Sequence, residues 1–127
     1  NHFPFRSSRY VKEDLQRNAA LIKELTGRDC RLFRPPFGVT NPNIARAARS
    51  LDYSVVGWSI RSLDGVPKNS EKTIKRVLSR LKPGRLILFH DNHAGIAAIL
   101  EKVIEEARSE GYEFVSPDKL LNIKAYR

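Results

Sequence analysis

Short apolar segments alternate along this chain with segments of helical periodicity, and this alternation restricts the folds open to it. Apolar segments occur near residues 30–34, 53–60, 85–90 and 112–115. A continuous apolar run of this length is typical of a strand that is buried on both faces of a parallel sheet. We therefore predict an α/β fold in which four parallel strands alternate with helices. Within the second strand, Val55 and Val56 are both predicted to be buried.

Local signals place the ends of the predicted helices. Apolar residues at helical spacing indicate a first helix that Gly27 closes. Asn41 followed by Pro42 is typical of the start of a helix, and Asn69 or Ser70 opens another. Gly111 stops the last long helix. The predicted helices cover about residues 8–25, 42–51, 70–81, 96–110 and 117–121.

Length and composition indicate a single domain. The chain has 127 residues, of which 41% are hydrophobic, and no stretch reaches the ~20 apolar residues of a membrane span. No linker, low-complexity stretch or internal repeat divides it. The chain begins with Asn1, contains no methionine, and has no strand before its first helix. We therefore expect one domain over residues 1–127 whose N-terminal strand or strands are missing.

The net charge of +9 favours an anionic partner such as nucleic acid, a membrane surface or an acidic glycan. The basic residues are scattered, however, and are densest on the predicted helix near residues 70–81. Aromatic residues do not alternate with them as a base-stacking platform requires. We expect a solvated helix face rather than a nucleic-acid groove. Steep salt dependence of nucleic-acid binding would favour the alternative.

Polar residues gather where the predicted strands end. In parallel α/β folds, function lies at the carboxyl ends of the strands. Here these ends are followed by Arg34–Gly38, by Trp58–Asp64 and by His90-Asp91, whereas the strand interiors are apolar. This placement predicts an enzyme site.

The first of these segments combines an arginine with a stiff turn. Arg34 precedes two prolines, which restrict the backbone, and its fork of donors suits the orientation of a carboxylate. The same turn would direct the backbone N–H of Phe37 into the site as an oxyanion donor. A rigid loop with an arginine salt bridge is an equally good interpretation.

The other two segments supply an imidazole and a carboxylate. His90 follows a core strand, where burial and a carboxylate would prepare it for general acid catalysis. Asp64 is a candidate for holding this imidazole in orientation, and Trp58 for lining a pocket. A structural histidine, a turn aspartate before Gly65 and a core tryptophan are the alternatives. We assign no role to His93.

These segments, in this order, resemble the motifs of the polysaccharide deacetylase family, which includes chitin deacetylases and the nodulation-factor deacetylase domain. The resemblance covers nearly the whole chain. It implies an incomplete (β/α) barrel and a metal-dependent hydrolase that removes acetyl groups, N-acetyl groups above all, from a polysaccharide or glycan. The implied cofactor is a divalent metal, usually Zn²⁺, which polarises the acetyl carbonyl and the attacking water.

The resemblance also implies a role for each motif residue. His90 would protonate the departing amine, Asp64 would tune His90, and Arg34 would orient a base aspartate. The backbone N–H of Phe37 would bind the oxyanion. Trp58, Leu88 and Pro36 would line the substrate pocket.

The chain departs from the family pattern near its start. The family's paired aspartates, which serve as base and metal ligand, are absent, and so is its pair of histidines four residues apart. His2 is the one candidate metal ligand, but Arg6 occupies the position four residues on. Gly65 stands where many members have a second tryptophan, which suggests a more open groove.

These departures leave a second interpretation open, in which the chain is an inactive fragment or a carbohydrate-binding remnant of the family. The expected partner is an acetylated glycan, and a cell-envelope or extracytoplasmic location is compatible with the resemblance. A barrel without its first strands exposes sheet edges, so we also expect a homodimer through these edges.

Overall fold

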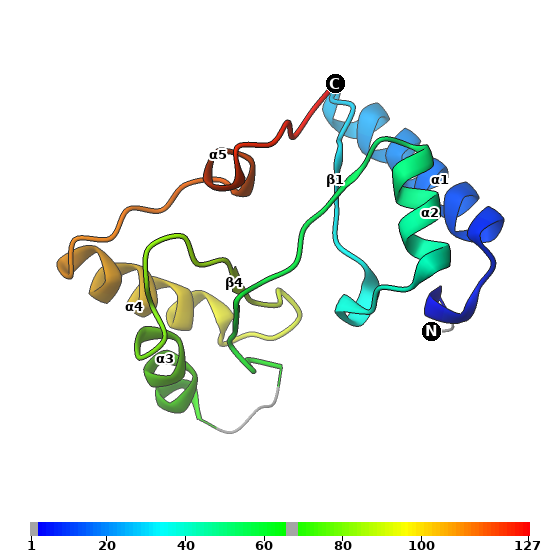
Figure 1. Ribbon diagram of the computed structural model, residues 1–127. Coiled ribbons are helices and arrows are strands. Elements are labelled where there is room, and N and C mark those ends of the chain that lie inside the picture. The colour runs from blue at the N-terminus through cyan, green and yellow to red at the C-terminus, as the bar shows by residue number, and fades with distance from the viewer. Residues whose placement is uncertain (1–2, 66–68) are drawn as a thin grey trace. The chain divides into compact units, whose positions relative to one another are not determined.

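The computed structural model describes residues 3–65 and 69–127 (Figure 1). The chain divides into two compact units. The first unit consists of Asn1–Gly57 together with Pro117–Arg127, and the second unit is Trp58–Ser116. The polypeptide therefore leaves the first unit after Gly57 and returns to it at Pro117.

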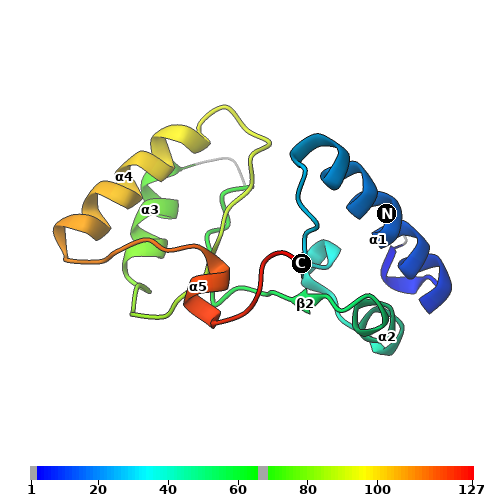
Figure 2. The ribbon, with the colours of Figure 1, turned by 90° about the horizontal axis from the view of Figure 1, so that it is seen from above.

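Two helices and a short parallel sheet form the first unit. Helix α1 (Ser8–Thr26) packs against α2 (Pro42–Ser50), and the two lie side by side in Figures 1 and 2. Strand β1 (Leu32–Phe33) pairs in parallel with β2 (Ser54–Val55). The remaining elements are the short 3-10 helices Phe3–Phe5 and Pro36–Gly38 and the helix α5 (Pro117–Leu121). The core of this unit comprises Phe3, Val11, Leu15, Ile44 and Ala47.

The helix ends of the first unit follow the local signals in the sequence. The backbone of Gly27 is left-handed, with φ of 70°, and its N–H donates to the carbonyl of Lys23. Glycine adopts this conformation without the steric cost of a Cβ. The Asn41 side chain accepts a hydrogen bond from the Ile44 N–H at 3.0 Å, ahead of Pro42. Both predicted helix ends are confirmed.

The second unit repeats the combination of a strand pair and a helix pair. Strand β3 (Ile60–Arg61) pairs in parallel with β4 (Ile87–Leu88). Helix α3 (Ser70–Leu78) begins after the cap residue Asn69 and packs against α4 (Ile96–Ser109). The buried residues Ile60, Val77, Ile99 and Val103 form its core.

Two of the predicted strands differ from the structure. The segment 53–60 is not one strand, since β2 and β3 lie at its ends and belong to different units. Val55 is 43% exposed rather than buried, whereas Val56 is 6% exposed. Successive side chains of an extended chain point to opposite sides, which is why Val55 is exposed while its neighbour Val56 is buried.

The segment 112–115 forms no strand, and its side chains Phe114 and Val115 are exposed. Residues with high β-propensity form a strand only where a neighbouring strand accepts their hydrogen bonds and packs on their side chains. This segment has no such neighbour among the described residues.

Both strand pairs are parallel and alternate with helices, so the predicted α/β class is confirmed. The described residues form two two-stranded sheets and no closed barrel. None of the helices formed by residues 3–65 and 69–127 combines the length and apolar character that a membrane span requires.

Replacing Val103 by Ala should destabilise the second unit, because Val103 is buried in its core and the change leaves a cavity. We expect the free energy of unfolding to fall by about 2 kcal/mol. Val115→Ala is the matched control, since the same two methyl groups are removed from a side chain that is half exposed. Denaturant titrations followed by circular dichroism measure both changes. Equal losses in the two variants would contradict the assigned core.

Candidate functional site

A buried carboxylate lies at the carboxyl ends of β3 and β4. The side chain of Asp64 is 0% exposed, although aspartate is almost never fully buried without partners. Ser62 Oγ donates to Asp64 Oδ1 at 2.6 Å, and His90 Nδ1 lies 2.9 Å from the same oxygen. The backbone N–H of His90 donates to Oδ2 at 2.7 Å. Both oxygens of the carboxylate are therefore satisfied by protein groups.

The parallel pairing explains why these residues meet. Ile60 and Ile87 are in register, and the Ser62 N–H donates to the Leu88 carbonyl at 3.3 Å, which continues the pairing beyond β3. Parallel strands end at the same edge of a sheet. Asp64 follows β3 and His90 follows β4, so both reach this edge.

These hydrogen bonds decide the ionisation of Asp64. Burial raises the pKa of its carboxyl group, but the hydrogen bonds from Ser62 and from the His90 ring and backbone outweigh burial. Together they lower the pKa of Asp64 to about 2. The carboxylate is thus charged at neutral pH, and the ring nitrogen at 2.9 Å lies next to a fixed negative charge.

A second imidazole lies against the same carboxylate. His93 Nε2 is 3.5 Å from Asp64 Oδ2, and this nitrogen is buried without a hydrogen-bond partner in the described structure. The sequence motifs assigned no role to His93 or to Ser62, a buried residue that donates to Asp64. A second histidine three residues after His90 was the available signal. The direction of the His93 side chain could not be predicted, because side chains in the loop before α4 do not follow the regular repeat of a helix or a strand.

The predicted arginine lies in the first unit, after β1. Arg34 donates from Nε to the Val56 carbonyl at 3.2 Å and from Nη2 to the Gly57 carbonyl at 3.1 Å. Its guanidinium thus binds the backbone that follows β2. Phe37 is 74% exposed and has φ of 58° and ψ of 5°. This left-handed conformation is uncommon for a residue other than glycine.

Arg34 and Pro36 line one pocket of about 390 Å³ in the first unit. Helix α1 contributes Asp14 and Asn18 to its wall, so the pocket combines a guanidinium with a carboxylate and an amide. The other lining residues are Phe3, Leu15, Leu32 and Phe33.

The structure brings only some of the predicted site residues together. Asp64 and His90 are in direct contact, and Trp58 and Leu88 are half-buried in the same unit. Arg34, Pro36 and Phe37 belong to the other unit. His2 lies outside the described residues, and within those residues no three or more metal-ligating side chains are grouped.

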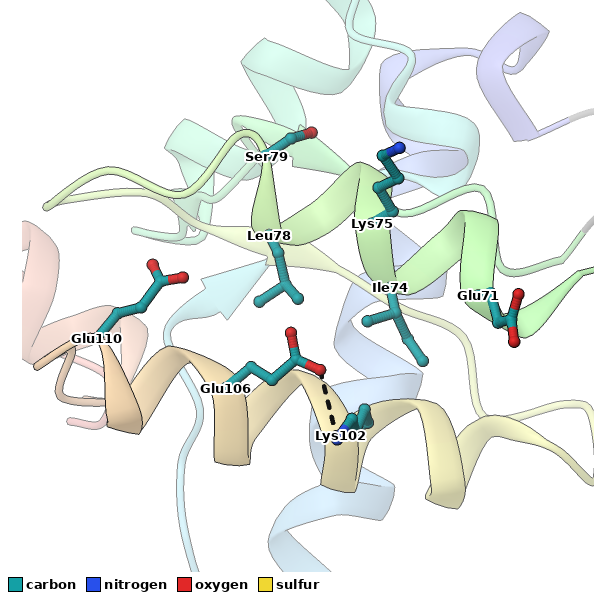
Figure 3. A pocket seen from close by; sticks show the side chains of 8 residues that line it. All are labelled: Glu71, Ile74, Lys75, Leu78, Ser79, Lys102, Glu106 and Glu110. Carbon is teal, nitrogen blue, oxygen red and sulfur yellow. Dashed lines mark ion pairs between the residues drawn. The ribbon is translucent and has the colours of Figure 1, made fainter.

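A pocket of the second unit lies elsewhere, between α3 and α4, and measures about 470 Å³. Ile74 and Leu78 point from α3 toward α4, where Lys102 pairs with Glu106 at 3.5 Å (Figure 3). The residues that line it include none of the predicted site residues.

The lowered pKa of Asp64 predicts a pH dependence of stability. Its folded-state pKa lies below that of an unfolded aspartate, so the charged form stabilises the fold above about pH 4. This contribution, about 2 kcal/mol, should disappear as the pH falls from about 4 to about 2. Urea titrations between pH 2 and 6 should reveal the loss in the wild type and not in Asp64→Asn. The variant Asp91→Asn, at an exposed aspartate, should retain it.

The chain is similar to known deacetylases in sequence. A family model described as polysaccharide deacetylase matches residues 1–56. The peptidoglycan-N-acetylglucosamine deacetylase PgdA of Listeria monocytogenes is 29% identical over 118 residues, which cover 93% of this chain and 25% of that protein. A peptidoglycan-N-acetylglucosamine deacetylase of Bacillus cereus is 32% identical over 98 residues, covering 73% of this chain and 46% of that protein. This chain thus spans a quarter to a half of these relatives.

Solved structures share the fold. The peptidoglycan deacetylase PdaC of Bacillus subtilis superposes with a TM-score of 0.86 at 22% identity, over 96% of this chain and 59% of that one. The family 4 carbohydrate esterase of Streptomyces lividans superposes with a TM-score of 0.82 at 25% identity, over 93% and 62%. The chain is therefore similar to polysaccharide deacetylases in sequence, and it shares the fold of solved members of that group.

Proposed function

We propose that this chain forms the His90 part of a metal-dependent hydrolase that removes acetyl groups, N-acetyl groups above all, from a polysaccharide or glycan. The observation that carries the proposal is the buried Asp64 carboxylate bonded to the exposed imidazole of His90. Several relatives are named as deacetylases of N-acetylglucosamine or N-acetylmuramic acid in peptidoglycan. We therefore propose an acetylated glycan of this class as the substrate.

In this proposal His90 is the general acid. Its Nδ1 is held by Asp64, and its side chain is 44% exposed, so Nε2 is the nitrogen left to donate a proton. Water adds to the acetyl carbonyl and loses a proton to the base carboxylate. The carbon–nitrogen bond then breaks, and the departing amine takes its proton from His90. The charge on Asp64 stabilises the imidazolium that precedes this transfer.

The residues of the first unit have supporting roles in the proposal. Arg34 orients a carboxylate that acts as base, and its two bonds to backbone carbonyls favour a fixed guanidinium. The backbone N–H of Phe37 contributes to an oxyanion site, which the left-handed conformation of this residue supports. Trp58, Leu88 and Pro36 are the residues proposed to contact the acetylated substrate. We also propose that residues 1–127 belong to a single deacetylase domain of the (β/α) barrel class.

The cofactor of the proposal is a divalent metal, with Zn²⁺ preferred. A bound divalent metal would polarise the acetyl carbonyl and the attacking water. The described residues do not by themselves fit a complete metal site. His2 is the proposed ligand from this chain. The roles of Asp64 and His90 rest on their own geometry and are independent of the metal.

Replacing His90 by Ala should lower acetate release from an N-acetylated oligosaccharide at least about 100-fold, because a general acid contributes a factor of this order. The assay uses an intact form of the protein that also carries the base aspartate and is loaded with zinc, and elemental mass spectrometry should find equal zinc in the wild type and the variant. Lys75→Ala, on an exposed face of α3, should retain wild-type release. Equal rates for the wild type and His90→Ala would remove His90 from the mechanism.

The same assay distinguishes the proposed hydrolase from the second interpretation of the sequence, an inactive, carbohydrate-binding remnant of the family. A wild-type chain that binds the oligosaccharide in calorimetry, releases no acetate and is unchanged by His90→Ala would be a carbohydrate-binding protein rather than a hydrolase.

We also propose that the chain self-associates through its strand edges. Each sheet has two strands, and Val55 in β2 is 43% exposed. Open edges of this kind pair with other copies. Light scattering over a concentration series should give a mass that rises from one chain toward two, and Val55→Lys should weaken the association. A constant monomer mass would contradict the proposal.

A further inference from the structure

The buried carboxylate of Asp64 has two imidazole neighbours. His90 Nδ1 lies 2.9 Å from Oδ1, and His93 Nε2 lies 3.5 Å from Oδ2. Oδ2 already accepts the backbone N–H of His90 at 2.7 Å. His93 Nε2 is buried and makes no hydrogen bond within the described structure. His93 thus lies within ion-pair distance of the Asp64 carboxylate, to which His90 is already hydrogen-bonded.

We propose that His93 is a positioning residue for His90, and that the two imidazoles share Asp64 as a coupled pair in which the charge of each ring sets the proton affinity of the other. The proposal rests on the proposed function for its catalytic meaning, because it concerns the proton that His90 donates. Its physical basis is only the pair of contacts that Asp64 makes with His90 and His93.

The coupling follows from one charge facing two bases. A proton on either ring is stabilised by the carboxylate, which is withdrawn from water and therefore weakly screened. When one ring is protonated, the carboxylate is neutralised for the other, and the two positive rings repel each other. Such groups titrate in two steps that belong to the pair.

The two contacts with the carboxylate differ in length. His90 Nδ1 lies 2.9 Å from Asp64 Oδ1 with hydrogen-bond geometry, whereas His93 Nε2 lies 3.5 Å from Oδ2. The carboxylate therefore interacts more strongly with the His90 ring than with the His93 ring.

Other charged groups do not replace this pairing. Within the described residues, Asp64 is the acidic group in ion-pair contact with either ring. Ser62, the remaining side-chain donor to Asp64, carries no charge. Asp91 lies between the two histidines in sequence, and its side chain is exposed to solvent, which screens it.

The test is an NMR titration of histidine rings in the full chain. The chain has three histidines, and single His→Gln replacements assign their signals. We expect the His93 midpoint to rise by about 0.5 pH unit or more in His90→Gln, since the competing positive charge is removed. In Asp64→Asn, both midpoints should fall. Lys75→Gln removes an exposed cation from the same unit and should move neither midpoint.

These outcomes separate the coupling from a structural role. A His93 that only fills space would titrate at the same pH in the wild type and in His90→Gln, and midpoints that agree to within about 0.2 unit would overturn the proposal. The titration needs no turnover. If the wild-type protein releases no acetate but its two histidine midpoints depend on each other, the proposed function alone is contradicted. If it releases acetate but the two midpoints are independent, the histidine pair alone is contradicted.

Discussion

The arrangement at the carboxyl ends of β3 and β4 depends on one buried negative charge. Transfer of a carboxylate from water to the protein interior is costly unless hydrogen bonds replace its hydration. Ser62 and His90 supply these bonds to Asp64, and they outweigh burial enough to lower its pKa to about 2. Because His90 binds Asp64 through both its ring and its backbone N–H, the carboxylate fixes the position and the orientation of the imidazole together.

The first unit uses a different means of fixing a functional side chain. Arg34 bonds to two backbone carbonyls at the end of the neighbouring strand, so the parallel pair β1–β2 serves as its support. The next turn holds Phe37 in a left-handed conformation, a local strain that persists only where the surroundings determine it. In both units, then, short parallel strands present polar groups at their carboxyl ends. This is the common location of function in α/β folds.

Much of the fold could be predicted from the sequence because it depends on local interactions. The ends of α1 and α2 follow from Gly27 and Asn41, whose backbone preferences are intrinsic. The strands were harder to predict from the sequence, because a strand forms only when it pairs with a neighbouring strand. The apolar segment 53–60 is divided between two units, and 112–115 forms no strand at all. No property of these residues in isolation distinguishes them from paired strand residues.

The sequence by itself determined the α/β class, the main helices and the identity of the motif residues Arg34, Asp64 and His90. Helical periodicity, caps and the position of polar residues after apolar runs are all encoded within a few neighbouring residues. Only the tertiary structure decided that Asp64 contacts His90 across 26 residues, and that His93 lies against the same carboxylate. Those contacts depend on the register of β3 with β4 and on the path of the loop before α4. Both are set by packing between segments far apart in the chain.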